Sequence, residues 1–449
     1  MARAVLTPFV CSACGRESAR WLGRCAGCGE WNSLVEAPAA LVRTGRPGAV
    51  PARVGSLAAV ALDDSRRIST GLGELDRVLG GGIVPGSLIL LAGEPGVGKS
   101  SLLLQSLHAT AAGGHEVLLV SGEESPAQVR LRAERLGAVD GVRILAETDV
   151  DVVCQTLDAE RPAVCVVDSV QTLHTADAGS TAGSVSQVRE SAARLLRLAK
   201  ETGVAVILVG HVTKEGSVAG PRVLEHLVDC VLQFEGDRYR YLRVLRAVKN
   251  RFGSTDEIGI FEMTDGGLAA VLDPSAMFAA AAAEPGPGSV LLPAIEGTRP
   301  ILLEVQALVA PSDLAMPRRS ATGFDRNRLS MITAVLGRHS GVALGTSDVY
   351  VNVAGGVRVD EPAADLAVAV AIVSAHRGRA VEPAAACFGE LGLTGRLRPV
   401  SQAARRLEEA AKLGVVRAVA PPGTPSRGGV DVAVADTLEA ALRAAFADE

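Results

Sequence analysis

One segment constrains the fold more than any other: Gly93-Glu94-Pro95-Gly96-Val97-Gly98-Lys99-Ser100. It has the G-x-x-x-x-G-K-S spacing of a phosphate-binding loop, in which glycines let backbone N–H groups point inward at an anion. Lys99 is expected to reach the β- and γ-phosphates, and the Ser100 hydroxyl to bind magnesium. The apolar run 87–92 before the loop predicts a buried strand. Residues 101–112, beginning with Ser101, predict a helix whose N-terminus faces the phosphates. The segment therefore predicts an ATP site.

Three further apolar runs predict strands at 117–120, 163–167 and 204–209. Amphipathic segments such as 184–201 separate them and predict helices. Alternating strands and helices of this kind form a parallel α/β sheet with ligands at the carboxyl ends of its strands.

Polar residues follow each predicted strand, where the catalytic groups of such a sheet are expected. Asp168 fits the carboxylate that holds magnesium through water. Glu123 and Glu124 are both candidates to polarise the attacking water, and we favour Glu123. His211 is a candidate sensor of the γ-phosphate, although a histidine after a strand is more often structural.

Two polar, glycine-rich stretches, 175–186 and 214–222, leave the same predicted edge of the sheet. Long loops at such an edge are usually functional. They either connect elements through solvent, or line a pore and contact the DNA backbone.

The N-terminus carries two C-x-x-C pairs, which together comprise Cys11, Cys14, Cys25 and Cys28. Two such turns can surround one structural zinc ion, with Trp21 and Trp31 available to cover it. A redox pair is the alternative, but two pairs in so short a segment favour metal. The other four cysteines are scattered, which suits a reducing cytoplasm rather than a disulfide framework.

Composition limits the remaining possibilities. The chain has 449 residues, 48% of them apolar, which is enough for two or three domains with cores of their own. Aromatic residues make up 3%, and the net charge is −5, so neither extensive base stacking nor a uniformly basic surface is expected. No apolar run reaches the roughly 20 residues of a membrane span. We therefore expect a cytoplasmic protein without a membrane partner.

The pentapeptide Lys249-Asn250-Arg251-Phe252-Gly253 follows a strand-like run at 241–248. It resembles the hallmark of a family of bacterial DNA-repair proteins, RadA or Sms. The order of parts is also similar to that family: four-cysteine finger, recombinase-type phosphate loop, pentapeptide, and a C-terminal domain similar to the Lon protease domain.

The resemblance implies a RecA-like, DNA-dependent ATPase that acts as a helicase-like motor in DNA repair. It would process recombination intermediates of single-stranded and branched DNA, promote branch migration with a RecA-type recombinase, and form a hexameric ring. Lys249 and Arg251 would reach a neighbouring subunit's γ-phosphate or grip DNA phosphates.

The expected domains are a zinc finger at 1–35, a linker at 36–65, the ATPase core at 66–272, a second linker at 273–288 and a Lon-like α+β domain at 289–449. Peptidases of the Lon type need a Ser-Lys dyad. Here the corresponding positions are Ala363 and Ala404. The resemblance thus implies a domain that has lost proteolysis and serves oligomerisation and DNA contact.

In this domain Arg318, Arg319, Arg326 and Arg328 form a basic cluster, with Arg338 further along, that either follows a DNA backbone or is a solvated surface. Two other functions compete with a DNA motor. One is an ATP-dependent peptidase, which the missing dyad opposes. The other is a nucleotide-switched scaffold or phosphotransferase of the clock-kinase type, which the pentapeptide and the finger oppose.

Overall fold

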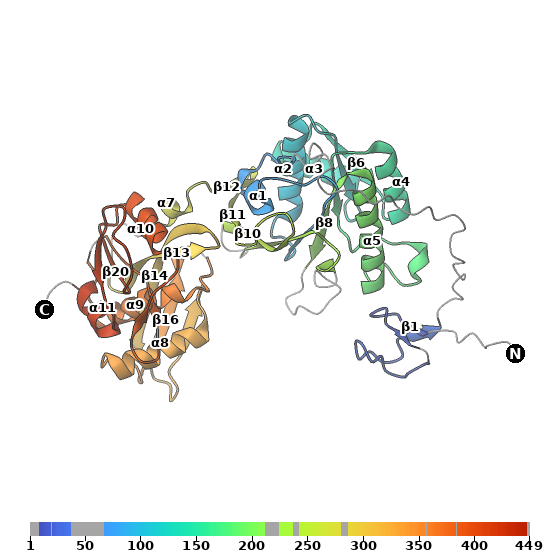
Figure 1. The fold of residues 1–449 in the computed structure, drawn as a ribbon. Helices are drawn as coiled ribbons and strands as arrows, with labels where there is room; N and C mark the ends of the chain where they lie inside the picture. Colours follow the sequence, from blue (N-terminus) through green and yellow to red (C-terminus); the bar gives the residue numbers. More distant parts are fainter. Residues whose placement is uncertain are drawn as a thin grey trace, which may run out of the picture. The chain divides into compact units, whose positions relative to one another are not determined.

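The computed structural model describes residues 9–18, 20–36, 67–211, 224–236, 242–279, 286–354, 357–382 and 384–446. The predicted loop 214–222 and nearly all of the predicted linker 36–65 lie outside these residues. The chain divides into two compact units, with the main boundary between Ala270 and Val271. Figure 1 shows the elements of each unit.

A small antiparallel sheet carries the N-terminal cysteines. Its strands are β1 (Phe9–Cys11), β2 (Glu17–Ser18) and β3 (Leu34–Glu36), in the order β2-β1-β3. The buried apolar side chains of this ribbon are Cys11, Cys25 and Leu34. A core of that size does not stabilise a fold by itself, so the ribbon needs the bonds of a metal ion.

The ATPase core is built on a nine-stranded sheet with the order β12-β11-β10-β9-β4-β8-β7-β5-β6. The strands from β9 to β6 in this order are parallel. The strands are β4 (Leu88–Gly93), β5 (Val117–Ser121), β6 (Val142–Ala146), β7 (Val164–Asp168), β8 (Ala205–His211), β9 (Cys230–Glu235), β10 (Leu242–Asn250), β11 (Ile258–Thr264) and β12 (Gly267–Ala270).

Helices cover both faces of this sheet because successive strand residues point to opposite sides. Ile89 and Leu91 pack in one apolar cluster with α1 (Gly73–Leu79), α2 (Lys99–Ala112) and α3 (Pro126–Leu136). Leu88 and Leu90 pack in another with α4 (Val150–Glu160) and α5 (Val185–Thr202). The predicted parallel α/β sheet is confirmed, and its strands and helices start and end within about two residues of the predicted runs.

The second unit contains a seven-stranded mixed sheet in the order β15-β16-β14-β13-β17-β20-β21. Its strands are β13 (Ser289–Glu296), β14 (Arg299–Pro311), β15 (Arg319–Thr322), β16 (Ser347–Val353), β17 (Ala385–Cys387), β20 (Arg417–Ala420) and β21 (Asp431–Val434), beside a small pair, β18 (Glu390–Leu391) and β19 (Leu397–Arg398).

The helices of this unit are α7 (Pro274–Ala279), α8 (Arg326–His339), α9 (Asp365–Arg377), α10 (Ala403–Lys412) and α11 (Leu438–Ala445). Helix α9 is its centre, because every residue from Asp365 to Ser374 is buried. The predicted α+β architecture is therefore confirmed. Among the described residues of the whole chain, no helix combines the length and apolar character needed to cross a membrane.

Candidate functional site: a nucleotide site on the sheet edge

The phosphate loop leaves the carboxyl end of β4 and enters α2, with Gly98 as the N-cap at a φ of 111°. A side chain at Gly98 would lie 2.9 Å from Met263, and one at Gly93 would lie 2.5 Å from the carbonyl of Phe234, so both positions need glycine. The loop is also braced from β10, since Arg243 donates to the carbonyl of Val97 over 3.1 Å. No pattern in the sequence indicated this role of Arg243.

Lys99 is buried at the start of α2, where its ammonium donates to the carbonyls of Gly93 (2.8 Å) and Glu94 (2.9 Å). Burial lowers the pKa of Lys99, and the carboxylates of Asp168 and Glu123 act in the opposite direction. The loop therefore already holds a cation facing two carboxylates, which is the charge arrangement that a magnesium–triphosphate complex needs.

Asp168 ends β7 beside Ser121 of β5, and His211 ends β8 beside Gly93 of β4. Glu123 follows β5, and its carboxylate accepts hydrogen bonds from the Ser169 hydroxyl and, over 3.3 Å, from His211 Nε2. The structure thus brings the predicted residues together at one end of the strands. Ser169 was missed, although its position directly after Asp168 was the available signal.

The two adjacent glutamates differ in their partners. Glu124 forms an ion pair with Arg132 of α3, whereas Glu123 bonds to groups of the nucleotide site. Within the described residues, the geometry therefore favours Glu123 as the group that faces the attacking water.

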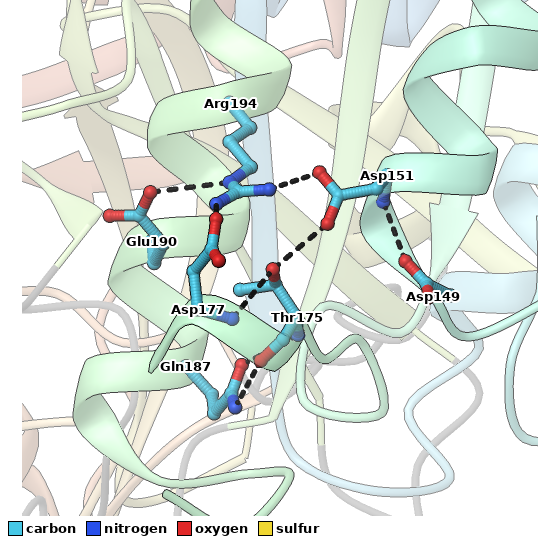
Figure 2. Close-up of polar contacts among 7 residues, drawn as sticks. All are labelled: Asp149, Asp151, Thr175, Asp177, Gln187, Glu190 and Arg194. Carbon is cyan, nitrogen blue, oxygen red and sulfur yellow. Dashed lines mark hydrogen bonds and ion pairs between the residues drawn. The ribbon is translucent and has the colours of Figure 1, made fainter. Parts of the chain in front are cut away.

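The loop 175–186 begins at the same end of the strands, and hydrogen bonds and ion pairs hold its first residues (Figure 2). Arg194 of α5 pairs with Asp151 of α4 and, over 2.6 Å, with Asp177 of the loop. The amide of Gln187 bonds to the main chain of Thr175 on both sides, at 2.9 and 3.0 Å. A hollow of about 430 Å³ lies next to these residues, lined by His174, Thr175, Ala176, Gly179, Ser180, Ala182 and Gln187. These contacts hold the exposed part of the loop in one place.

The pentapeptide lies at the end of the strands opposite the phosphate loop. Lys249 pairs with Val231, and Cys230 pairs with Ile89, where β4 begins. The ammonium of Lys249 donates to the carbonyls of Glu225 and Val228, the latter at 2.8 Å.

Arg251 pairs with the buried Asp229 at that same end of the strands. Asp229 also accepts from Lys200 over 2.6 Å and from the amide of Leu88 over 3.0 Å. The cations of the pentapeptide therefore face away from the phosphate loop of their own chain. The sequence carried no signal for Asp229.

The four N-terminal sulfurs form a compact group, with all ligand atoms within 4.8 Å of one another. The Sγ atoms of Cys11 and Cys28 are 3.6 Å apart, and those of Cys14 and Cys25 are 3.5 Å apart. A tetrahedral zinc with bonds of about 2.3 Å requires sulfur–sulfur edges of about 3.8 Å, so the group fits zinc.

The tryptophans do not have the covering role that the sequence suggested. Trp21 is 53% and Trp31 is 68% exposed. The side chains that pack against the cysteines are Phe9, Ala13 and Leu22 instead.

In the C-terminal unit, Ala363 is buried in the short turn Pro362–Ala364, and Ala404 lies in the first turn of α10. The segments around them are joined by a buried ion pair in which Arg406 donates to both oxygens of Glu361, at 2.8 and 2.6 Å.

The predicted arginine cluster is divided. Arg328 makes a bidentate pair with the fully buried Asp365, at 2.5 and 2.7 Å, and Arg319 donates to the carbonyls of Leu344 and Ser347. Both are therefore structural, which neither interpretation of the cluster foresaw. The remaining three, Arg318, Arg326 and Arg338, are exposed.

Comparison with known families follows the same division of the chain. The AAA domain model matches residues 56–217, the rubredoxin metal binding domain matches residues 9–36, and the model named subunit ChlI of Mg-chelatase matches residues 317–424. These matches fit the ATPase core, the four-cysteine zinc ribbon and the Lon-like C-terminal domain.

Relatives match over nearly the full length. DNA repair protein RadA of Brucella abortus (strain 2308) is 51% identical, over 93% of this chain and 92% of that protein. The proteins of the same name from Bacillus subtilis (strain 168) and Escherichia coli (strain K12) are 46% and 47% identical, over 96% and 94% of this chain and 97% and 94% of theirs. Combined with an AAA ATPase core and a four-cysteine ribbon, this similarity shows that the chain belongs to the RadA family of DNA repair proteins.

Proposed function

We propose that the chain is a DNA-dependent ATPase that works as a motor on single-stranded and branched DNA. In recombination it would promote branch migration together with a RecA-type recombinase. One observation carries the proposal: Glu123 is bonded to His211, and His211 leads directly into the segment 214–222 that is expected to contact DNA. A structural change in that segment on DNA binding would therefore move His211 and, through their hydrogen bond, the carboxylate of Glu123, which activates the water.

The roles of the site residues follow from their positions. Backbone N–H groups of the loop 93–100 and the ammonium of Lys99 bind the phosphates of ATP. Ser100 and Asp168 hold magnesium, which neutralises charge on the phosphates when it is bound. Glu123 orients and polarises the attacking water, while Ser169 and His211 keep its carboxylate in place.

The position of the pentapeptide supports a ring. Lys249 and Arg251 lie at the end of the strands opposite the phosphate loop, so they do not complete the nucleotide site of their own chain. In a closed, head-to-tail ring, such as the hexamer that the family resemblance implies, each subunit presents two different surfaces to its neighbours, so a residue remote from its own site can reach the next one. We infer that at least one of these cations acts on the neighbour's γ-phosphate as a trans-acting finger.

The Lon-like domain serves assembly and DNA contact rather than proteolysis. Ala363 and Ala404 lack both a nucleophile and a base. The buried ion pair between Arg406 and Glu361 joins the segments that contain Ala404 and Ala363. The exposed Arg318, Arg326 and Arg338 are the arginines of the predicted cluster that are available for DNA phosphates.

The rate of ATP hydrolysis with and without single-stranded DNA tests this function. We expect a clear stimulation by DNA. A nucleotide-switched scaffold or a phosphotransferase would show no stimulation. An ATP-dependent peptidase would instead degrade casein in the presence of ATP, and that activity would vanish with a point substitution in the Lon-like domain. Either of these results would overturn the proposal.

A further inference from the structure

We propose that Trp21 and Trp31 form a stacking site for unpaired DNA bases on the zinc ribbon. The inference rests on the proposed DNA-dependent function and adds a second DNA contact outside the ATPase core. It goes against the expectation from the low aromatic content, because both tryptophans of this chain lie in the zinc ribbon.

The two indoles come close to each other at the same glycine. A methyl group at Gly23 would be 3.8 Å from Cη2 of Trp21 and 3.8 Å from Cζ3 of Trp31. Gly23 has no side chain, so nothing from that residue stands between the rings. The backbone holds this arrangement, since the amide of Asn32 donates to the carbonyl of Gly23 over 2.8 Å. The pair is therefore built into the ribbon rather than formed by two independent surface residues.

The exposure of these rings is unusual within the molecule. Trp21 and Trp31 are the only tryptophans of the chain, and each exposes more than half of its surface. The next most exposed aromatic ring among the described residues is Phe252, at 36%. Large aromatic side chains gain more from burial than most others, so an exposed pair indicates a partner that covers it.

A guanidinium accompanies the rings. Arg24 lies over Trp31, with 5.8 Å between its Cζ and the ring centroid, and its Nε donates to the carbonyl of Gly29 over 2.7 Å. The fixed guanidinium keeps further N–H groups for an anion. Arg20 is a second exposed cation next to Trp21. A ring face beside a cation is the combination that binds a base together with its phosphate.

The surroundings favour a nucleotide over a protein partner. Protein hot spots lie near the centre of a larger interface, surrounded by contacts that exclude water. Here the neighbouring side chains Arg20, Arg24, Glu30 and Asn32 are exposed and polar, and Leu22 is turned toward the cysteines. Besides the two rings, Val35 is the exposed large apolar side chain of the described ribbon, and the surface of the rings matches the size of one or two bases.

The charge of the ribbon decides which form of DNA binds. Residues 9–36 contain three arginines and three glutamates, and four thiolates on one zinc ion add negative charge. Phosphate attraction is therefore weak, and stacking must supply the affinity. Stacking needs unpaired bases, so the site takes single strands and not intact duplex, with a shallow dependence on salt.

The test uses the intrinsic fluorescence of the full-length, zinc-loaded protein, because both tryptophans belong to the proposed site. Titration with a short oligodeoxythymidylate should quench the fluorescence, with little change between low and moderate salt. A duplex of the same length and an abasic strand with the same phosphates should leave it unchanged. Replacing either indole, in Trp21→Ala or Trp31→Ala, should weaken the binding measured by the remaining indole by about 5- to 100-fold.

Val35→Ala is the matched control, since Val35 is 53% exposed on the same ribbon and has no ring. Equal zinc content in all variants shows that the ribbon is intact. If single-stranded DNA stimulates ATP hydrolysis but does not quench, the stacking site is wrong and the proposed function stands. If a recombinase protein alone changes the fluorescence and DNA does not, the pair is a protein contact. If DNA neither stimulates nor quenches, the proposed function itself fails.

Discussion

Arg251 Nη1 lies 3.2 Å from Oδ1 of the buried Asp229, at the end of the strands opposite the phosphate loop. Asp229 keeps two further donors, Lys200 and the amide of Leu88. Removing Arg251 therefore does not leave a buried charge unpaired, and its own side chain is 55% exposed. An exposed partner of this kind contributes about 0–1 kcal/mol to stability, so its substitution reports on function.

The first prediction concerns action across a subunit interface. Arg251→Ala or Lys249→Ala should lower ATP hydrolysis by about 1,000-fold or more if that residue is the trans-acting finger. Mixing the inactive variant with Lys99→Ala protein should partly restore hydrolysis, because some rings then pair an intact phosphate loop with an intact neighbouring cation. Hydrolysis rates of the mixtures measure this.

A mixture of the two variants that stays inactive would contradict the trans role. If the subunits demonstrably exchange and no activity returns, the trans role is wrong. A parallel loss of DNA affinity, with a salt dependence reduced by about one ion per residue, would identify Lys249 and Arg251 as DNA contacts instead.

The second prediction separates the two glutamates. Glu123→Gln should reduce the rate of ATP hydrolysis by about 100- to 10,000-fold without weakening ATP binding, because it removes the base while keeping the shape. Glu124→Gln is the control and should remain within a few-fold of the unaltered protein, since Glu124 is paired with Arg132 outside the site. Steady-state hydrolysis and nucleotide titration check both. Equal losses would show that the assignment of the two residues is wrong.

The third prediction concerns Lys99. Lys99→Ala should abolish nucleotide turnover, because no other described cation occupies the phosphate loop. The ammonium bonds only to the loop's own carbonyls in this structure, so circular dichroism should show a folded protein. Near-normal turnover would refute the nucleotide site.

The fourth prediction is that each chain binds about one zinc ion. Elemental analysis of protein prepared without chelators should show this, and a variant with Cys11→Ser and Cys28→Ser should lose the ion. ATP should still raise the thermal unfolding temperature of this variant by about as much as it does for the unaltered protein. Equal zinc in both preparations would place the ligands elsewhere.

The sequence predicted most of the ATPase core, because the loop 93–100 and apolar strands ending in polar residues are local patterns. It favoured Glu123 but held no partner that separates it from Glu124, since Arg132 of α3 meets Glu124 only in the fold. It also could not find Asp229 or the Arg328–Asp365 pair. Those partners are 22 and 37 positions apart and meet only through the fold.

If ATP hydrolysis moves DNA strands, the rate of branch migration will show it. The measurement follows the branch point of a labelled joint molecule with time, in the presence of a RecA-type recombinase and ATP. We predict that the protein accelerates movement of the branch point. Glu123→Gln protein should bind the same DNA and leave the branch where it was. Rapid DNA-stimulated hydrolysis with a branch point that moves no faster than without the protein would show that hydrolysis is not coupled to strand movement.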